Sequence, residues 1–397
     1  MGIVGKNLKR IATKIASHCY RREKDLWVFG EWMGNRCCDN SLSFANYIAE
    51  NHPQIRLVWI AKKTADTSLL SPKIRVVEME SPEAVGVLRR AGVAVMNQGR
   101  VDFAQDMSFD CDGALTVQLW HGVPWKKIGL DGLPANGTFH RLYNRYLQHL
   151  QRADLHLVLS DDFAQIMNRA YCAEKKGMIF AGYPRNRIFY QKEKISEARN
   201  KILDMLHQQG LQVSADSKII TYMPTFRDNT EDVFSFEQLQ SDSRLSQLLD
   251  EHDAVIVQKA HFVSHQRSGG KDSAASCRIT SLNDAAAQEL LAATDILVTD
   301  YSSCFFDFLL LDRPIIHYIY DYDYYAHEDR GLYYKAEDVV CGDDPRTVDA
   351  LLDSLKKNLE DPGKDSRLRS QRKGEYLQYE SVNSCEILFA EIQKRLH

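Results

Sequence analysis

The first residue whose type suits catalysis is a histidine that follows a predicted strand. His121 and Gly122 come just after the β-branched run 114–119, and Lys126 lies four residues beyond Gly122. A near-neutral imidazole suits general-base removal of a proton from a hydroxyl nucleophile. Gly122 permits close backbone approach, and Lys126 can meet phosphate charge. The alternative interpretation is a buried histidine that is bonded to a loop carbonyl.

Two further groups follow predicted strands in the second half of the chain. Thr225 and Arg227 come after the first of these strands and offer a hydroxyl and a guanidinium to an anion. Lys259 and His261 come after the next strand. Residues two apart on extended backbone point to the same side, so both can face one phosphate. For the first pair taken alone, a structural turn with a surface arginine is the better interpretation, and for the second pair a solvated loop explains the residues equally well.

The most specific group lies between a predicted strand and an apolar helix. It consists of Thr299, Asp300, Ser302 and Ser303, with Asp307 four residues beyond on the same helix face. Ser302 is a suitable N-cap, and the free N–H groups of a helix start together with two hydroxyls suit a phosphate. Asp300 can orient the loop or bond a sugar hydroxyl. Simple helix capping is the competing interpretation, and it is compatible with phosphate binding.

A last group follows a tyrosine-rich loop. Arg330 can stabilise charge on a diphosphate, although the tyrosines suit a covering role for the second domain. Asp321 and Asp323 can pair around a weakly held divalent cation. The sequence contains no dinucleotide fingerprint, Walker loop, HExxH helix or GxSxG elbow. No metal site and no cofactor are therefore predicted, with a divalent cation left open.

The elements that position these groups are short β-branched runs alternating with helical patterns, which is typical of parallel sheets flanked by helices. Because ligands bind beyond the carboxyl ends of parallel strands, motifs that follow strands gain weight. The predicted strands are 26–30, 56–60, 74–78, 93–97, 114–119, 155–159, 178–181, 218–222, 254–258, 277–280, 296–299 and 314–318. The predicted helices are 42–50, 83–91, 139–152, 163–171, 236–251, 284–293, 303–312, 347–359 and one final polar helix over 366–395.

This alternation predicts an α/β protein with two Rossmann-like halves and a cleft between them. A length of 397 residues also suits two domains. The expected organisation is a basic segment 1–24, a first Rossmann-like domain 25–190, a linker 191–217, a second Rossmann-like domain 218–365 and a C-terminal helix 366–397 that can cross back onto the first half.

Composition excludes several classes of protein. A net charge of −4 argues against bulk nucleic-acid binding. The nine cysteines are odd in number and contain no C-x-x-C pair, which favours reduced thiols in the cytoplasm. No run of 18 apolar residues is present, and lysines interrupt the apolar positions of the N-terminus. We therefore expect neither a membrane span nor a signal peptide.

The segment 1–24 carries seven Lys/Arg and one acid, Glu23. On a helix, Val4, Leu8, Ile11 and Ile15 would form one apolar stripe. A basic amphipathic helix can lie in the interface of an anionic membrane. A solvated helix packed on the first domain is the alternative.

Taken together, the strings resemble the CDP-glycerol glycerophosphotransferase family of teichoic acid and capsule polymer synthesis. The matching strings occur in the family's order over about residues 115–335 and are preceded by a similar glycine and Asp-Asn loop. They are Trp120-His121-Gly122, Gly182-Tyr183-Pro184-Arg185-Asn186, Tyr222-Met223-Pro224-Thr225-Phe226-Arg227, Lys259-x-His261, Thr299-Asp300-Tyr301-Ser302-Ser303 and Arg330-Gly331, with Gly34 and Asp39-Asn40 upstream.

The resemblance implies a GT-B fold and a phosphotransferase that displaces CMP at the β-phosphorus of CDP-glycerol. It implies His121 as the base, with His261 as a second catalytic residue. The residues that it implies for holding the donor diphosphate are Thr225, Arg227, Lys259, His261, Thr299, Asp300, Ser302, Ser303 and Arg330, supported by Gly122, Lys126 and Asp307. The implied partners are a CDP-alditol donor, a lipid-linked or polymer acceptor, and the inner face of the cell membrane, contacted through 1–24. No nucleic acid is implied, and a homo-oligomer is left open.

The sequence departs from the family at one position, because Phe262 stands where the family usually has a proline after the Lys-x-His string. The length is that of a catalytic unit alone and is close to the primase-type enzymes, although short polymerases also exist. Three alternatives remain open: a GT-B glycosyltransferase that uses a nucleotide-sugar, a CDP-ribitol ribitolphosphotransferase, and an inactive scaffold at a membrane.

Overall fold

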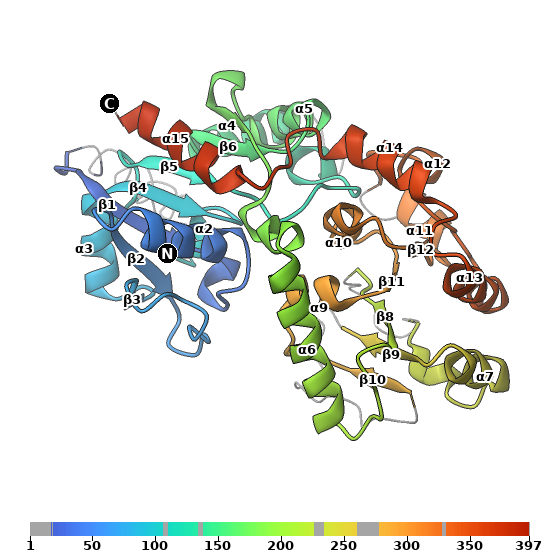
Figure 1. Ribbon diagram of the computed structural model, residues 1–397. Helices are drawn as coiled ribbons and strands as arrows, with labels where there is room; N and C mark the ends of the chain where they lie inside the picture. The colour runs from blue at the N-terminus through green and yellow to red at the C-terminus, as the bar shows by residue number, and fades with distance from the viewer. Residues whose placement is uncertain are drawn as a thin grey trace. The chain divides into compact units, whose positions relative to one another are not determined.

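The computed structural model describes residue 17 and residues 19–105, 110–133, 138–225, 234–259, 278–327 and 331–396. Contacts divide the chain into two compact units (Figure 1). The first unit comprises Met1–His121, Gly129–Arg187 and Gln378–His397, and the second comprises Gly122–Ile128 and Ile188–Leu377. Neither unit is one continuous stretch of the sequence.

In the first unit, seven parallel strands among the described residues form one sheet in the order β3-β2-β1-β4-β5-β6-β7. The strands are β1 (Glu23–Gly30), β2 (Arg56–Ala61), β3 (Arg75–Glu78), β4 (Ala91–Met96), β5 (Leu115–Gln118), β6 (Leu155–Val158) and β7 (Met178–Phe180). The helices are α2 (Asn40–Asn51), α3 (Pro82–Arg90), α4 (Thr138–Gln151), α5 (Asp161–Tyr171) and α15 (Ser384–Leu396), with the 3-10 turns η1 (Trp32–Gly34), η2 (Arg100–Asp102), η3 (Gly129–Gly132), η4 (Lys175–Gly177) and, at the boundary of the units, η5 (Pro184–Tyr190).

Both faces of this sheet are covered, which is why its strands are apolar almost throughout. Successive side chains of β1 point to opposite faces. Leu26 and Val28 join the core cluster that includes Val87 of α3. Trp27 lies on the other face, where its ring contacts Phe44 of α2 at 6.4 Å and Phe389 of α15 at 5.5 Å. Helix α15 therefore completes the first core.

In the second unit, five parallel strands of the described chain form a sheet in the order β10-β9-β8-β11-β12. The strands are β8 (Lys218–Tyr222), β9 (Ala254–Gln258), β10 (Ile279–Ser281), β11 (Ile296–Thr299) and β12 (Ile315–His317). The helical elements are α6 (Lys192–Gln208), η6 (Phe236–Leu239), α7 (Ser243–Glu251), α9 (Ala287–Ala293), α10 (Cys304–Phe308), η7 (Leu309–Leu311), α11 (Tyr322–His327), α12 (Ala336–Val339), α13 (Val348–Glu360) and α14 (Ser366–Tyr376). Helices α7 and α13 share one core cluster with this sheet, whereas α6 lies beside α9 (Figure 1).

The predicted α/β class and every predicted strand are confirmed, with ends that shift by three residues at most. Two helix predictions are wrong. The helix expected over 236–251 is broken, because the carboxylate of Asp242 accepts from the N–H of Arg244 and starts α7 anew. The single helix expected over 366–395 is two helices, α14 in the second unit and α15 in the first.

Several segments differ in character from the expectation. The stretch 191–217, expected as a polar linker of helical pattern, contains α6, which contacts α9 and is grouped with the second unit. The tyrosine-rich loop runs into the short helix α11, and a second short helix, α12, follows after Tyr334. Most of the basic segment 1–24 lies outside the described residues, and β1 already begins at Glu23. No helix in the described part of the chain has the length and apolar character needed to span a membrane.

Candidate functional site

The strand order of the first sheet reverses between β1 and β4, and buried acids gather at the carboxyl ends of these two strands. Glu31 directly follows β1 and accepts hydrogen bonds from the backbone N–H groups of Cys38, Asp39 (2.9 Å) and Leu42 (3.3 Å). Burial, and then the neighbouring Asp39, raise the pKa of Glu31 well above its usual range. Such a reversal is where open parallel sheets bind ligands.

A strained turn follows Glu31. Trp32, Met33 and Gly34 have φ values of 47°, 56° and 72°. For residues other than glycine this left-handed backbone conformation costs about 1–3 kcal/mol each, and it persists only where the surrounding structure holds it. The Gln98 side chain accepts from the N–H of Trp32 at 2.6 Å, and Asp102 accepts from the N–H of Met33 at 2.9 Å. These bonds fix the turn and place the Trp32 indole beside the His121 ring, with 5.9 Å between centroids.

Asp102 is buried and also accepts from the N–H groups of Asn97 (2.9 Å) and Gln98 (2.7 Å). Burial raises the pKa of Asp102 to about 7, against the opposing effect of these bonds. An aspartate in an unfolded chain has a pKa of about 3.9. The folded protein therefore retains a proton at Asp102 that the unfolded chain releases, and this contribution to stability is lost as pH rises through 7.

We expect this titration to appear as a pH-dependent stability difference. Between pH 5.5 and 8 the free energy of unfolding should fall by about 2 kcal/mol more in the native protein than in an Asp102→Asn variant, which has no carboxyl to titrate. Urea titrations of both proteins at several pH values measure this difference. Parallel pH profiles would show that Asp102 is ionised throughout this range.

His121 is held at the end of β5 by its backbone. Trp120 has a φ of 62°, and its carbonyl accepts from the Asn40 side chain at 3.0 Å. The Trp120 and His121 rings lie 4.3 Å apart between centroids, and His121 is half-buried. The carbonyl of His121 accepts from Arg185 at 3.1 Å. The imidazole thus lies beside two indoles, and the two backbone carbonyls are anchored by Asn40 at the start of α2 and by Arg185.

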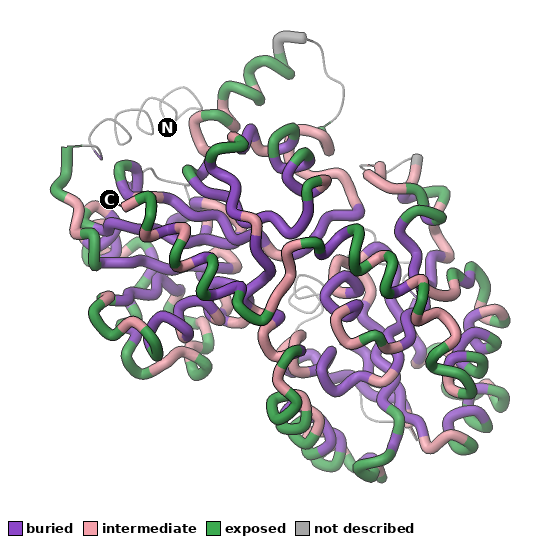
Figure 2. Tube along the Cα trace, turned by 45° about the horizontal axis from the view of Figure 1, so that its top comes forward, coloured by how far each residue is buried: buried purple, intermediate pink, exposed green. Residues whose placement is uncertain are grey.

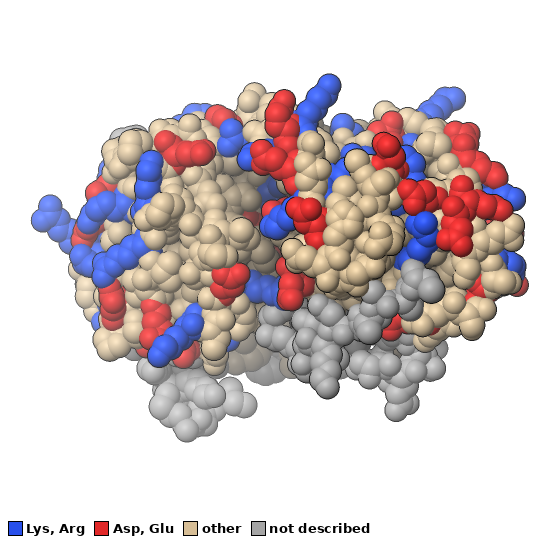
Figure 3. All heavy atoms as spheres, turned by 60° about the horizontal axis from the view of Figure 1, so that its bottom comes forward, with Lys and Arg blue, Asp and Glu red and all other residues tan. Residues whose placement is uncertain are grey.

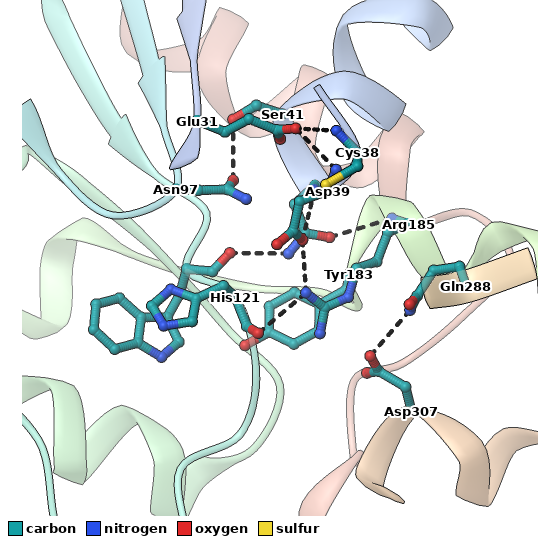
Figure 4. Close-up of polar contacts among 12 residues, drawn as sticks. Glu31, Cys38, Asp39, Ser41, Asn97, His121, Tyr183, Arg185, Gln288 and Asp307 are labelled. Atoms are coloured by element: carbon teal, nitrogen blue, oxygen red, sulfur yellow. Dashed lines mark hydrogen bonds and ion pairs between the residues drawn. The ribbon is translucent and has the colours of Figure 1, made fainter. Parts of the chain in front are cut away.

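A buried ion pair supports this arrangement (Figure 4). Arg185 Nη1 lies 2.6 Å from Asp39 Oδ1, and the two side chains are 8% and 6% exposed. Asp39 also caps α2 and accepts from the Trp32 indole at 3.1 Å. The Tyr183 ring lies 4.9 Å from the guanidinium. Asp39 and Arg185 therefore connect the turn that contains Trp32, the start of α2 and the backbone of His121.

The second sheet reverses its order between β8 and β11, and three described members of the predicted donor set, Thr225, Thr299 and Asp300, lie at this edge. The N–H of Thr225, beyond β8, donates to Asp300 Oδ1, beyond β11, at 2.7 Å. The hydroxyl of Thr299 donates to the Met223 carbonyl at 2.7 Å. Asp300 and Thr299 are fully buried. These two bonds join the strand ends at the reversal point, where the sequence predicted a phosphate site.

Lys259 extends the same edge beyond β9. Its backbone N–H donates to the Tyr222 carbonyl at 2.9 Å, and its buried Nζ donates to the Asn283 carbonyl at 2.6 Å. A buried ammonium keeps its charge only with such oxygen partners. Lys259 therefore places a positive charge within the row of strand ends that carries Thr225 and Asp300.

The start of α10 differs from the prediction in one respect. Ser303, not Ser302, occupies the N-cap position, and within the described chain its side chain makes no capping bond. Both serines are half-buried. Asp307 is buried and accepts from the Gln288 side chain at 3.0 Å, so it braces α10 against the neighbouring α9 (Figure 4).

The residues after His121 belong to the second unit. Gly122 has a φ of 151°, which favours glycine at the transition. Trp125 is buried against Tyr301 at 5.2 Å between centroids, and its indole donates to the Tyr334 carbonyl at 2.9 Å. The Lys126 ammonium lies 5.2 Å from the centre of the Tyr325 ring. The predicted group His121, Gly122 and Lys126 is therefore divided, because His121 belongs to the first unit and Gly122 and Lys126 belong to the second.

The comparisons with known proteins decide the class. The family described as CDP-Glycerol:Poly(glycerophosphate) glycerophosphotransferase matches residues 12–394. The chain belongs to this family. The predictions of a glycerophosphotransferase family and of a transferase enzyme are confirmed.

Relatives of this glycerophosphotransferase include a teichoic acid glycerol-phosphate transferase of Staphylococcus aureus, 30% identical over 84% of each chain. A teichoic acid poly(glycerol phosphate) polymerase of Bacillus spizizenii is 32% identical over 61% of this chain, and the match spans 60% of the polymerase. A structure of the wall teichoic acid polymerase TagF aligns with a TM-score of 0.79 and 22% identity, over 98% of this chain and 94% of that one. This likeness confirms the predicted GT-B fold class.

The structure describes some of the predicted site residues of this glycerophosphotransferase and not others. Arg227, His261 and Arg330 lie outside the described residues. No cluster of three or more His, Cys, Asp or Glu side chains suited to a metal occurs in the described part, and Asp321 accepts from the Tyr301 hydroxyl at 3.2 Å. Sequence reasoning assigned no role to Asp39, Asn40 or Arg185. The signal was present, because the string that contains Arg185 follows a predicted strand at the same sheet edge as His121.

Proposed function

We propose that this glycerophosphotransferase moves glycerol phosphate from CDP-glycerol to a hydroxyl of a lipid-linked or polymer acceptor in teichoic acid or capsule polymer synthesis. The acceptor oxygen forms a bond to the β-phosphorus of the donor. The bond from that phosphorus to the bridging oxygen breaks, and CMP leaves with the electron pair. The acceptor proton passes to His121.

The assignment of the residues that bind CDP-glycerol is supported by the point where the strand order of the second sheet reverses. Thr225 and Asp300 are joined across it, and Lys259 lies beyond the next strand. We assign Lys259, Ser302 and Ser303 to the diphosphate, with Arg227, His261 and Arg330. Fixed positive charges and N–H donors stabilise the charge that develops on a transferring phosphoryl group. Thr299 and Asp307 hold the loop in place, since Thr299 donates to the Met223 carbonyl beyond β8 and Asp307 accepts from Gln288 of α9.

The assignment of His121 as the general base is supported by the contacts that hold this residue in place. A general base must keep its geometry while it accepts a proton, and the contacts of the His121 ring with Trp32 and Trp120 support this. The carbonyl bond from Arg185 fixes the backbone beneath the ring. A buried histidine with a purely structural role remains the competing assignment for this residue.

The acceptor and the location follow from the same chemistry. CDP-activated donors are cytoplasmic, and a lipid-linked acceptor requires the enzyme to work at a membrane. We therefore propose a peripheral location on the inner face of the cell membrane, with the basic segment 1–24 as one contact. A homo-oligomer is compatible with this placement.

The proposal is tested by nucleotide release from a panel of donors. The purified protein is incubated with membranes and, in separate reactions, with CDP-glycerol, CDP-ribitol, and UDP- and GDP-sugars. We expect CMP from CDP-glycerol and no UDP or GDP. CMP from CDP-ribitol alone would reassign the alditol, and release from a nucleotide-sugar would reassign the enzyme to the glycosyltransferases. A protein that binds membranes and releases nucleotide from no donor would be the scaffold.

A further inference from the structure

Residues 378–383 bring the chain back from α14 to the first unit, where α15 follows. The N–H of Tyr379 donates to the carbonyl of Leu159, which follows β6, at 3.0 Å. The Tyr379 ring contacts Phe180, the last residue of β7, with 4.9 Å between centroids. The carboxyl ends of β5, β6 and β7 share one edge of a parallel sheet. The returning segment therefore lies at the sheet edge that carries His121.

Glu380, the next residue, differs from the acids at the surface. Many acidic side chains lie in solvent among lysines and arginines, as the face in Figure 3 shows. Glu380 is half-buried, and its Oε1 atom is shielded from solvent. Its Oε2 atom accepts from the N–H of Tyr183 at 3.0 Å and from the side chain of Asn186 at 3.2 Å. Tyr183 and Asn186 are fully buried, within the interior that Figure 2 shows in purple.

Gly182 shows how closely this carboxyl group fits. A Cβ atom at residue 182 would lie 2.2 Å from Glu380 Oε1 and 2.5 Å from Ser384 Oγ. The φ of Gly182 lies outside the left-handed region, so the space taken by these atoms explains the glycine. The loop after β7 is therefore built to accept the carboxyl group of Glu380 against its backbone.

The start of α15 gives Glu380 no equivalent task. The hydroxyl of Ser381 accepts from the N–H of Asn383 at 3.2 Å, and the Ser381 carbonyl accepts from the Ser384 hydroxyl at 2.5 Å. These local bonds lead the chain into the helix. The two bonds that Glu380 accepts from Tyr183 and Asn186 instead join parts of the chain that are far apart in the sequence.

The loop that Glu380 holds contains the arginine that anchors His121. The N–H of Arg185 donates to the Asn40 side chain at 3.2 Å. Its guanidinium donates to Asp39 at 2.6 Å and to the His121 carbonyl at 3.1 Å (Figure 4). Asn40 and Arg185 hold the carbonyls of residues 120 and 121. Both anchors of the His121 backbone therefore depend on the position of this loop.

We propose that Glu380 is a positioning residue of the transfer reaction, which acts through Arg185 on the orientation of His121. The inference rests on the proposed function, because it takes His121 as the base. Glu380 fixes the residues on either side of Arg185, and Arg185 fixes the backbone of His121. A misplacement of about 1 Å at a reacting group can cost about 100-fold in rate, so this support matters for turnover. The last segment of the chain thus completes the site of a histidine that follows β5.

Turnover of CDP-glycerol tests the role of the carboxyl group. Glu380→Ala removes the acceptor of two buried donors, and we expect turnover to fall about 10- to 100-fold. The KM for CDP-glycerol should stay unchanged, because the assigned donor residues follow strands of the second sheet. Glu380→Gln keeps an oxygen at the Oε2 position and should retain most of the turnover. Gly182→Ala should reproduce the loss, because its methyl group takes the place of the carboxyl group.

Glu391→Ala is the matched control. It removes a carboxyl group from the same returning part of the chain, but Glu391 pairs with Arg395 inside α15. This variant should turn over like the native protein. Native turnover in Glu380→Ala would overturn the inference. An equal loss of thermal stability and turnover in the alanine and glutamine variants would also overturn it, because the carboxyl group would then support the fold alone.

A double variant tests the route through Arg185. Glu380→Ala combined with Arg185→Met should turn over like Arg185→Met alone, because the second change removes the group through which the first one acts. Losses that multiply would show that Glu380 acts independently of Arg185, which contradicts the proposed route.

Hydrogen exchange followed by mass spectrometry reads the positioning without catalysis. In Glu380→Ala, exchange should become faster in residues 182–186 and also in residues 119–123, whereas Glu380→Gln should exchange like the native protein. Faster exchange in residues 182–186 alone would confine Glu380 to its own loop and overturn the inference. If the native protein releases CMP from no donor, the proposed function fails, and exchange in residues 119–123 still shows whether Glu380 holds the backbone of His121.

Discussion

Replacing His121 by alanine should lower glycerol phosphate transfer by about 10²- to 10⁴-fold, the usual contribution of a general base. The fold should persist, because Asn40 and Arg185 bond the backbone carbonyls of residues 120 and 121 rather than the imidazole. CMP release at saturating CDP-glycerol measures the loss in turnover. Calorimetric titration of CDP-glycerol should give an unchanged dissociation constant, because the donor residues assigned here follow other strands.

The matched control is His207→Ala, which removes an exposed histidine from α6. This variant should turn over like the native protein. Near-normal turnover in the His121 variant would exclude the base assignment and favour a structural histidine. Loss of thermal stability together with activity would indicate that the imidazole supports the fold.

Replacing Arg185 by methionine should have the largest effect on stability. The change leaves Asp39 buried without its cation, and removing one partner of a buried pair typically costs about 3–5 kcal/mol. The bond to the His121 carbonyl is lost as well, so turnover should fall even in the folded fraction. Urea titration measures the free energy of unfolding, and CMP release at low temperature measures the turnover.

Two variants control this experiment. Arg56→Met breaks an exposed pair with Asp25 and should cost less than about 1 kcal/mol. In the double variant Asp39→Asn with Arg185→Met, part of the lost stability should return, because no unpaired charge remains buried. Turnover of the double variant should stay low, since the anchor of His121 is still missing. Full recovery of turnover would show that the pair acts on stability alone.

The sequence predicts the two sheets well for a physical reason. Strands covered on both faces are nearly continuous apolar runs, so Trp27 and Val28 signal β1 regardless of tertiary context. Groups that follow such strands necessarily share a sheet edge, which is why Thr225, Lys259 and Asp300 could be placed together before the structure was known.

The remaining features depend on contacts that no local pattern encodes. The left-handed backbone of Trp120 is stabilised by a long-range contact. The side chain of Asn40, 80 residues earlier, donates a hydrogen bond to the Trp120 carbonyl. Asp39 and Arg185 are 146 residues apart, and their pairing follows only from the folded sheet. The break before α7 could have been predicted, because Asp242 is a favourable N-cap residue. The helical spacing of apolar residues on both sides of Asp242 instead indicated one continuous helix.

The interleaving of the two units constrains how the protein is made. Residues 378–396 are synthesised after the whole second unit, yet Phe389 stacks on Trp27 and on His52 in the first. The nascent first unit therefore lacks α15, and has only α2 against Trp27, while the 188–377 stretch of the second unit emerges. This interleaving also means that a single truncation of the chain yields neither unit alone.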